Sequence, residues 1–189
     1  IVALVFDDSI KHRRGKNVKG SSSHFDHTLR KHVMGQQVLE MGLVTPKGYA
    51  SLDSQIYISD KNAQEGKLAF KDNRSAVAKD YQNAKEKNKN QMLRAMLKRA
   101  VKSSIKATHV IADSWFGNKE NIKAILFHSL KGVLRMKRGN LQYLYKDNLY
   151  TATELFAIIK ISMKKIKNTH YSTCSLTVQL NISDKKKKP

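Results

Sequence analysis

The chain opens with an uninterrupted apolar run that ends at two aspartates. Residues 1–6 read Ile-Val-Ala-Leu-Val-Phe, and Asp7 and Asp8 follow directly. Such a run is typical of a strand buried on both faces, as in the centre of an α/β sheet. A secretory signal peptide would need a charged region before it and small residues at a cleavage site, and both are missing. Because proteins rarely begin inside such a strand, we expect the chain to be a fragment of a longer one.

Periodicity predicts an ordered series of further elements. The first half has a basic connection over 10–23, strands over 33–44 and 49–58 and a helix over 90–101. A strand over 108–112 follows, then a helix capped by Asn118 and ended by Gly132, and a strand over 133–136. The last elements are a helix from Thr151 to about Lys160 and a strand over 171–180. Antiparallel strands come first and crossover helices follow, which is typical of an α/β fold with a mixed sheet.

Carboxylates stand where two of the predicted strands end. Asp7 and Asp8 follow the first strand, and Asp113 follows the fourth. Open α/β sheets place their chemistry at strand ends, and this order allows the first and fourth strands to be neighbours. Converging aspartates offer the hard oxygen ligands that suit Mg²⁺. Two such ions can activate a water molecule and stabilise the leaving oxygen of a phosphodiester.

The charge of the chain indicates a polyanionic partner. Lysine and arginine total 36 against 15 acidic residues, which gives a net charge of +21 and a pI near 10.1. Nucleic acid is the first candidate, because phosphate neutralisation releases counterions, and an anionic membrane surface is the second. No apolar run approaches the roughly 20 residues of a membrane-spanning helix. The single cysteine, Cys174, excludes an internal disulfide framework and suits a reducing cytoplasm.

Four short motifs together resemble bacterial insertion-sequence transposases of the DDE type. The motifs are Phe6-Asp7-Asp8-Ser9, Lys11-His12-Arg13-Arg14-Gly15-Lys16, His24-Phe25-Asp26-His27-Thr28 and Ile111-Ala112-Asp113-Ser114-Trp115-Phe116. The resemblance is closest to the group with a β-strand insertion in an RNase-H-like catalytic domain, and it extends from residue 1 to about residue 156. It implies a mixed sheet with flanking helices that is incomplete at the C-terminus.

The resemblance also implies roles for individual residues. Asp8 matches the first catalytic carboxylate, with Asp7 as its neighbour, and Asp113 matches the second. Asp8 and Asp113 would then be ligands of Mg²⁺ or Mn²⁺. The residues expected to hold DNA phosphates beside them are Lys11, Arg13, Arg14, Lys16 and Lys19.

By the same resemblance, the substrate is DNA, at transposon ends and at the target. Such enzymes nick the ends of the element and use the freed 3′-hydroxyl to attack target DNA. The resemblance allows a homodimer of the full-length enzyme. Its expected location is the bacterial cytoplasm, in association with the nucleoid and not with a membrane. Residues 1–139 would form the catalytic core with its first five strands, and residues 140–189 the start of a β-rich insertion and a basic tail.

The sequence departs from that family at the third carboxylate. The family carries a glutamate on a later helix, in a signature of Tyr, Arg, Glu and Lys that this chain lacks. Only Glu120 and Glu154 lie beyond Asp113. Glu154 stands three residues after Thr151, the spacing of a capping box, and Glu120 lies in the first turn of a helix. We therefore expect the third carboxylate beyond residue 189 and the fragment alone to be inactive.

Two other functions stay open from the sequence alone. Another RNase-H-like nuclease would need a third acid within these residues, such as Glu154 or Asp147. A non-enzymatic basic nucleic-acid-binding protein would use the aspartates only as helix or turn caps. A zinc site at His24, His27 and His32 with Asp26 is disfavoured, because no cysteine accompanies them. The DNA sequence recognised and the oligomeric state do not follow from the sequence.

Overall fold

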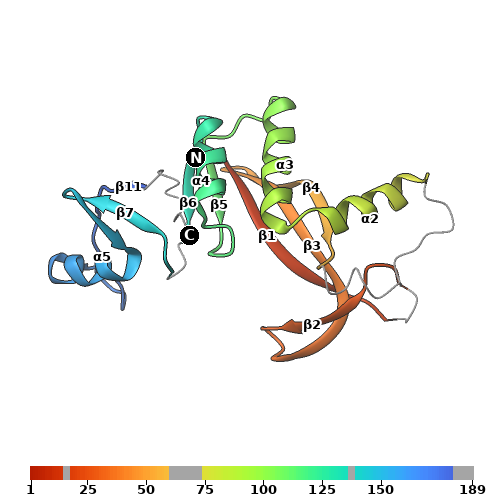
Figure 1. The fold of residues 1–189 in the computed structure, drawn as a ribbon, viewed down its shortest axis with the longest axis horizontal. Coiled ribbons are helices and arrows are strands. Elements are labelled where there is room, and N and C mark those ends of the chain that lie inside the picture. The colour runs from red at the N-terminus through yellow and green to blue at the C-terminus, as the bar shows by residue number, and fades with distance from the viewer. Residues whose placement is uncertain (15–17, 60–73, 136–138, 181–189) are drawn as a thin grey trace, which may run out of the picture.

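The computed structural model describes residues 1–14, 18–59, 74–135 and 139–180, and its centre is a six-stranded mixed sheet. The strands are β1 (Ala3–His12), β2 (Ser22–Asp26), β3 (Lys31–Thr45), β4 (Gly48–Tyr57), β5 (His109–Ala112) and β6 (Lys131–Leu134). Their order is β2-β3-β1-β5-β6, and β4 pairs with the same edge of β3 as β2 does. The predicted fold class, an RNase-H-like mixed sheet with flanking helices, is confirmed (Figure 1).

The first predicted strand lies between an antiparallel and a parallel neighbour. β1 pairs with β3 along its whole length, from Ala3 opposite Val44 to His12 opposite Gly35. On its other edge it pairs in parallel with β5, from Ala3 beside His109 to Phe6 beside Ala112. The predicted adjacency of the first and fourth strands, which are β1 and β5, is therefore confirmed.

The core lies between this sheet and helix α3 (Lys89–Lys102). Asn88 caps the helix in a capping box with Gln91, so the predicted helix over 90–101 is confirmed. Alternate residues of the strands face it, and burial of each large side chain contributes about 1.5–3 kcal/mol. The side chains that meet in this layer are Leu4 and Phe6 of β1, Leu39 and Met41 of β3, Val110 and Ala112 of β5, and Met92, Leu93, Met96 and Leu97 of α3.

Helix α4 (Lys119–Phe127) packs beside α3 and connects β5 to β6. Asn118 caps it as predicted, by accepting a hydrogen bond from the backbone N–H of Asn121. The predicted end at Gly132 is wrong. The helix ends at Phe127, because Ser129 adopts a left-handed backbone conformation (φ 57°), and Gly132 lies within β6.

In the part of the structure that surrounds the six-stranded sheet, β2 and α2 were absent from the sequence prediction, and one connection is shorter than expected. β1 continues to His12, so the predicted connection over 10–23 is reduced to the residues between His12 and Ser22. β2 is too polar to show an apolar alternation, and its backbone pairing with β3 defines it. Helix α2 (Ala76–Glu86) buries only Ala78, Tyr81 and Ala84, which leaves a weak periodic signal.

The remaining described elements form two small sheets and a short helix. The elements are β7 (Gln142–Tyr145), β8 (Asn148–Thr151), α5 (Ala152–Ile159), a 3₁₀ turn (Lys160–Ser162), β9 (Lys164–Lys165), β10 (Ser172–Thr173) and β11 (Gln179–Leu180). Thr151 caps α5 as predicted. The predicted strand over 171–180 is wrong, because β10 pairs with β9 whereas β11 pairs with β7. The predicted strand over 133–136 overlaps β6, and Met136 lies outside the described residues. The domain boundary near residue 139 stays a prediction.

Replacing Gly35 with alanine is expected to destabilise the fold. An added Cβ would lie 2.7 Å from the Lys11 carbonyl oxygen and 2.8 Å from Ile10 Cγ2, and backbone cannot move aside cheaply. We expect a loss of about 1–3 kcal/mol in the free energy of unfolding, measured by denaturant titration. Gly139→Ala is the control, since nothing lies within 4 Å of its added Cβ. Equal stability of both variants would contradict the close approach of β1 and β3.

Candidate active site between β1 and the end of β5

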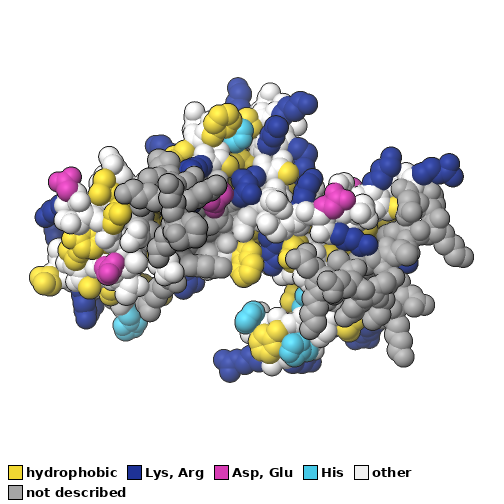
Figure 2. Space-filling view, in the orientation of Figure 1, with side chains coloured by type: hydrophobic (Ala, Val, Ile, Leu, Met, Phe, Trp, Pro, Cys, Tyr) yellow, Lys and Arg dark blue, Asp and Glu magenta, His cyan; other side chains and the backbone are white. Residues whose placement is uncertain are grey.

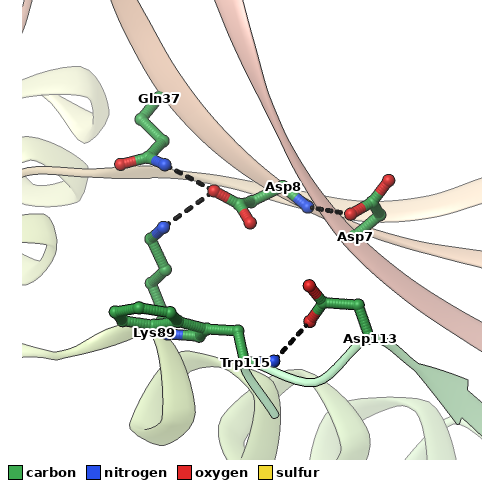
Figure 3. A network of polar contacts seen from close by, with 6 residues as sticks. All are labelled: Asp7, Asp8, Gln37, Lys89, Asp113 and Trp115. Carbon is green, nitrogen blue, oxygen red and sulfur yellow. Dashed lines mark hydrogen bonds and ion pairs between the residues drawn. The ribbon is translucent and has the colours of Figure 1, made fainter. Parts of the chain in front are cut away.

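Asp8 lies where the apolar face of β1 becomes polar. By strand alternation its side chain shares a face with Leu4 and Phe6, which are buried under α3. Its carboxylate accepts a hydrogen bond from the side-chain amide of Gln37 on β3. The Lys89 ammonium at the start of α3 lies 2.7 Å from the same oxygen, Oδ2. Asp8 is thus held by both the sheet and the covering helix (Figure 3).

Lys89 is an unusual residue for its position. It is the first residue of α3, where the positive end of the helix dipole disfavours a cation, and only 8% of it is exposed. Its ammonium is compensated by Asp8 and by two aromatic rings, with centroids 5.0 Å away for Trp115 and 5.2 Å for Tyr57. Lys89 therefore connects Asp8 to the loop that follows β5 (Figure 3).

Asp113 starts that loop and lies next to β1. Its predecessor Ala112 pairs with Phe6, so the parallel register, extended by one residue, brings Asp113 beside Asp7. Asp113 Oδ1 accepts a hydrogen bond from the backbone N–H of Trp115 at 2.8 Å, which fixes the start of the loop. Asp7 Oδ1 accepts one from the backbone N–H of Asp8 at 2.9 Å.

The three aspartates interact electrostatically. The pKa of Asp7 is raised above 3.8, chiefly because burial disfavours the charged carboxylate. The hydrogen bond from the Asp8 backbone opposes this rise, whereas the negative charges of Asp8 and Asp113 add to it. The prediction that the first strand ends before Asp7 is wrong, because pairing with β3 continues β1 through both aspartates to His12. Asp7, Asp8 and Asp113 therefore lie near one another where β5 ends beside the middle of β1.

Four residues that the sequence analysis did not place beside these aspartates lie near them. They are Gln37, Lys89, Trp115 and His24. His24 of β2 has a lowered pKa, first because of burial and further because of the Lys89 charge, while the Gly35 backbone and Asp8 oppose the shift. No sequence motif identifies Lys89, but a lysine at the start of an amphipathic helix is a local anomaly that could have drawn attention to it.

The aspartates are the right type of ligand for a divalent metal ion, but their side chains are not arranged to hold one. Carboxylate oxygens are the preferred ligands of Mg²⁺ and Mn²⁺. Within the described residues, however, no three His, Cys, Asp or Glu side chains are arranged to hold an ion. One oxygen of Asp8 is engaged by Lys89, so a metal would bind its other oxygen or displace the ammonium.

The predicted DNA-binding residues extend from the far end of β1. Lys11 and Arg14 are exposed, and Arg13 Nε donates a hydrogen bond to Gln36 at 2.8 Å. The buried Gln36 amide in turn donates to the Lys19 carbonyl at 2.7 Å, which holds this segment against β3. Lys11 and Arg13 also line a groove of about 970 Å³ between the sheet and α2. Lys16 lies outside the described residues.

The other acids have structural positions. Thr151 and Glu154 form the predicted capping box, with Glu154 accepting from the Thr151 backbone at 2.7 Å. This hydrogen bond lowers the pKa of Glu154. Glu120 lies in the first turn of α4 as predicted. Asp147 lies in the left-handed turn between β7 and β8.

Comparison with known families assigns the chain to a nuclease superfamily. The DDE superfamily endonuclease profile matches residues 1–153, which include the whole six-stranded sheet and all three aspartates. The chain therefore belongs to the DDE superfamily of endonucleases, whose members act on DNA and generally use divalent metal ions. No curated protein and no solved structure matches it. None of its helices, within the described residues, is long and apolar enough to cross a membrane.

Replacing Asp7 with asparagine is expected to raise the melting temperature at neutral pH. The folded pKa is above the unfolded value of 3.8, so the charged carboxylate costs stability once the pH rises past that value. Asparagine removes the charge and keeps the oxygen that accepts from the Asp8 backbone. The gain in melting temperature should shrink as the pH falls toward 4, because the Asp7 carboxyl is then increasingly protonated in both the folded and the unfolded wild-type chain. The exposed Asp80→Asn serves as control, and an equal gain there would contradict a local cause.

Proposed function

We propose that the chain is the catalytic core of an insertion-sequence transposase, which cleaves DNA and transfers the strand. The observation that supports this most directly is the parallel pairing of β1 with β5, which brings Asp7 and Asp8 next to Asp113. The superfamily match supports a DNA-cleaving nuclease, and the four sequence motifs support the narrower transposase assignment. The proposed location is the bacterial cytoplasm, in association with the nucleoid.

In this proposal Asp8 and Asp113 hold Mg²⁺ or Mn²⁺, with Asp7 beside them. The ion would supply a Lewis acid and an activated water at the phosphodiester. The chain's own residues set the geometry: Gln37 and Lys89 orient Asp8, and the Trp115 backbone orients Asp113. Asp7 contributes a third negative charge that favours a cation at this end of the sheet.

The proposed substrate is DNA at transposon ends and at the target. The basic segment of Lys11, Arg13, Arg14, Lys16 and Lys19 begins three residues along from Asp8, near enough to hold the phosphates that flank the cleaved bond. The net charge of +21 supports a strong electrostatic contribution to binding. In the full-length enzyme, a homodimer would hold two such ends.

The division into parts follows the same proposal. Residues 1–139 form the catalytic core, and residues 140–189 begin a β-rich insertion with a basic tail. Glu154 is engaged in its capping box, so it is a poor candidate for the third carboxylate. With two or three aspartates as its ligands, the site would bind metal weakly, and the chain by itself would have little cleavage activity.

One observation favours a second function, that of a basic nucleic-acid-binding protein without catalysis. The Lys89 ammonium already neutralises Asp8, as it would in a purely structural ion pair. In that case the aspartates would stabilise the fold, and DNA binding would be independent of divalent metal. The response of metal binding to single substitutions separates the two functions.

Replacing either Asp8 or Asp113 with asparagine is expected to weaken Mn²⁺ binding by about tenfold or more in calorimetry. Each substitution removes a charged oxygen ligand, and one lost ligand of this kind typically costs more than 1 kcal/mol. Asp53→Asn is the matched control, because Asp53 is also a strand carboxylate with a cationic partner, Arg99 at 2.7 Å. Binding that is absent in the wild type, or indifferent to both changes, would favour the structural role.

Replacing Lys89 with methionine is expected to tighten Mn²⁺ binding several-fold. The substitution preserves an unbranched side chain between the two rings and frees the Asp8 oxygen that the ammonium engages. Lys98→Met removes the same charge from the exposed face of α3 and should have little effect. Weaker metal binding by the Lys89 variant would instead show that the ammonium is needed to hold Asp8 in place.

A further inference from the structure

The hairpin of β2 and β3 projects beyond the end of β1. Asp26 fixes its turn: Oδ1 accepts hydrogen bonds from the backbone N–H groups of Thr28 at 2.8 Å and Leu29 at 3.0 Å. The other oxygen, Oδ2, lies 3.1 Å from His12 Nε2, which ties the turn to the last residue of β1. Figure 1 shows the hairpin extending away from the helices that cover the sheet.

Large apolar side chains are exposed on this hairpin without a core to cover them. Phe25, Leu29 and Met34 are 44%, 48% and 47% exposed. The Phe25 ring makes edge contacts with His27 and His32, at centroid distances of 5.1 and 5.4 Å. Figure 2 shows apolar and histidine side chains together with lysine or arginine on this projection. A scattered exposed apolar residue is ordinary, but three on one short hairpin indicate a contact surface.

The charge of the same hairpin is positive. Arg30 and Lys31 stand at its turn, and Asp26 is the one acid between residues 22 and 34. Both Asp26 oxygens are engaged, by the turn backbone and by His12. In the described part of the chain, neither Arg30 nor Lys31 forms an ion pair with a carboxylate. Their charges are therefore available to an anionic partner.

We propose that this hairpin tip, defined as Phe25 and residues 27–32, is a second DNA-contacting surface, apart from the basic segment that starts at Lys11. Arg30 and Lys31 would bind backbone phosphates, and Phe25 would pack on a deoxyribose or an unpaired base beside them. The inference rests on the proposed function in so far as DNA is the substrate. Histidines and phenylalanine beside cations fit nucleic acid better than direct contact with a second copy of this chain, since copies with a charge of +21 repel each other where no DNA lies between them.

The position of the tip suits DNA that also reaches the aspartates. His12 is four positions along β1 from Asp8, a distance of about 13 Å along the strand. The Asp26 carboxylate contacts the His12 ring. The tip is thus roughly half a turn of duplex away from Asp8, since one turn of B-DNA spans about 34 Å. One DNA molecule can contact both places, so the hairpin would set the angle at which the duplex crosses β1 near the end of β5.

The test is binding of a labelled duplex of about 30 base pairs, followed by fluorescence anisotropy over a series of salt concentrations without divalent metal. The charge variant is Arg30→Asn with Lys31→Gln, because asparagine tolerates the left-handed conformation of Arg30 (φ 52°). We expect it to weaken binding about tenfold and to reduce the slope of log K against log salt by about 1.8, or about 0.9 per lost phosphate contact. Phe25→Ala should weaken binding without changing that slope.

Two matched controls keep the result specific. Lys123→Gln with Lys131→Gln also removes two exposed lysines, and Lys131 begins β6 at the strand end opposite Asp113. Phe127→Ala removes a phenylalanine that is 84% exposed and likewise contacts a histidine edge-on, with 5.2 Å between ring centroids. Circular dichroism melting shows whether each variant is folded.

The outcomes separate this inference from the proposed function. If the hairpin variants lose affinity and slope as expected while both controls bind as the wild type does, the surface is supported. If the charge variant and its control lose equal affinity, the hairpin has no special part, while DNA binding by the chain stands. A wild-type chain that binds no duplex at any salt concentration would overturn both. A concentration-dependent dimer that Phe25→Ala abolishes, with DNA binding unchanged, would overturn the inference in favour of self-association.

Discussion

The parallel pairing of β1 with β5 is the constraint on which the site depends. Only four residue pairs make this contact, yet they join segments more than 100 residues apart and place the end of β5 beside the middle of β1. The intervening hairpin and helices allow that closure, because α3 covers the face from which Leu4 and Phe6 project. A shift of one residue in this register would send the alternate side chains of β1 to the opposite face and separate Asp8 from Lys89.

The packing of α3 on the sheet buries the Lys89 ammonium, which costs electrostatic free energy, and it also brings the groups that offset this cost. A lysine that is 8% exposed at the positive end of a helix would destabilise the fold if it were alone. The carboxylate of Asp8 and the rings of Trp115 and Tyr57 surround it, so three separate elements depend on one ammonium. The Lys89 ammonium consequently holds the site together in the absence of metal, and a metal ion that binds Asp8 has to compete with this ion pair.

The sequence was most informative where burial was strongest. The apolar run before Asp7, the strand before Asp113 and the amphipathic helix were each predicted from periodicity, and the adjacency of the first and fourth strands followed from their order. β2 and α2 were missed, because a polar strand is defined by its partner's backbone and a mostly exposed helix shows little apolar pattern. The nearness of Lys89, Gln37 and His24 to Asp8 was missed, because it exists only after folding brings these residues together.

The chain contains one tryptophan, and its position has a practical consequence. Trp115 is two residues from Asp113, and its ring is half-exposed and in contact with the Lys89 ammonium. The ultraviolet emission excited at the red edge of protein absorption therefore originates from one indole, at the junction of β5, α3 and the aspartates. The molecule thus carries an intrinsic optical probe at the place where its chemistry is expected, and no label needs to be attached.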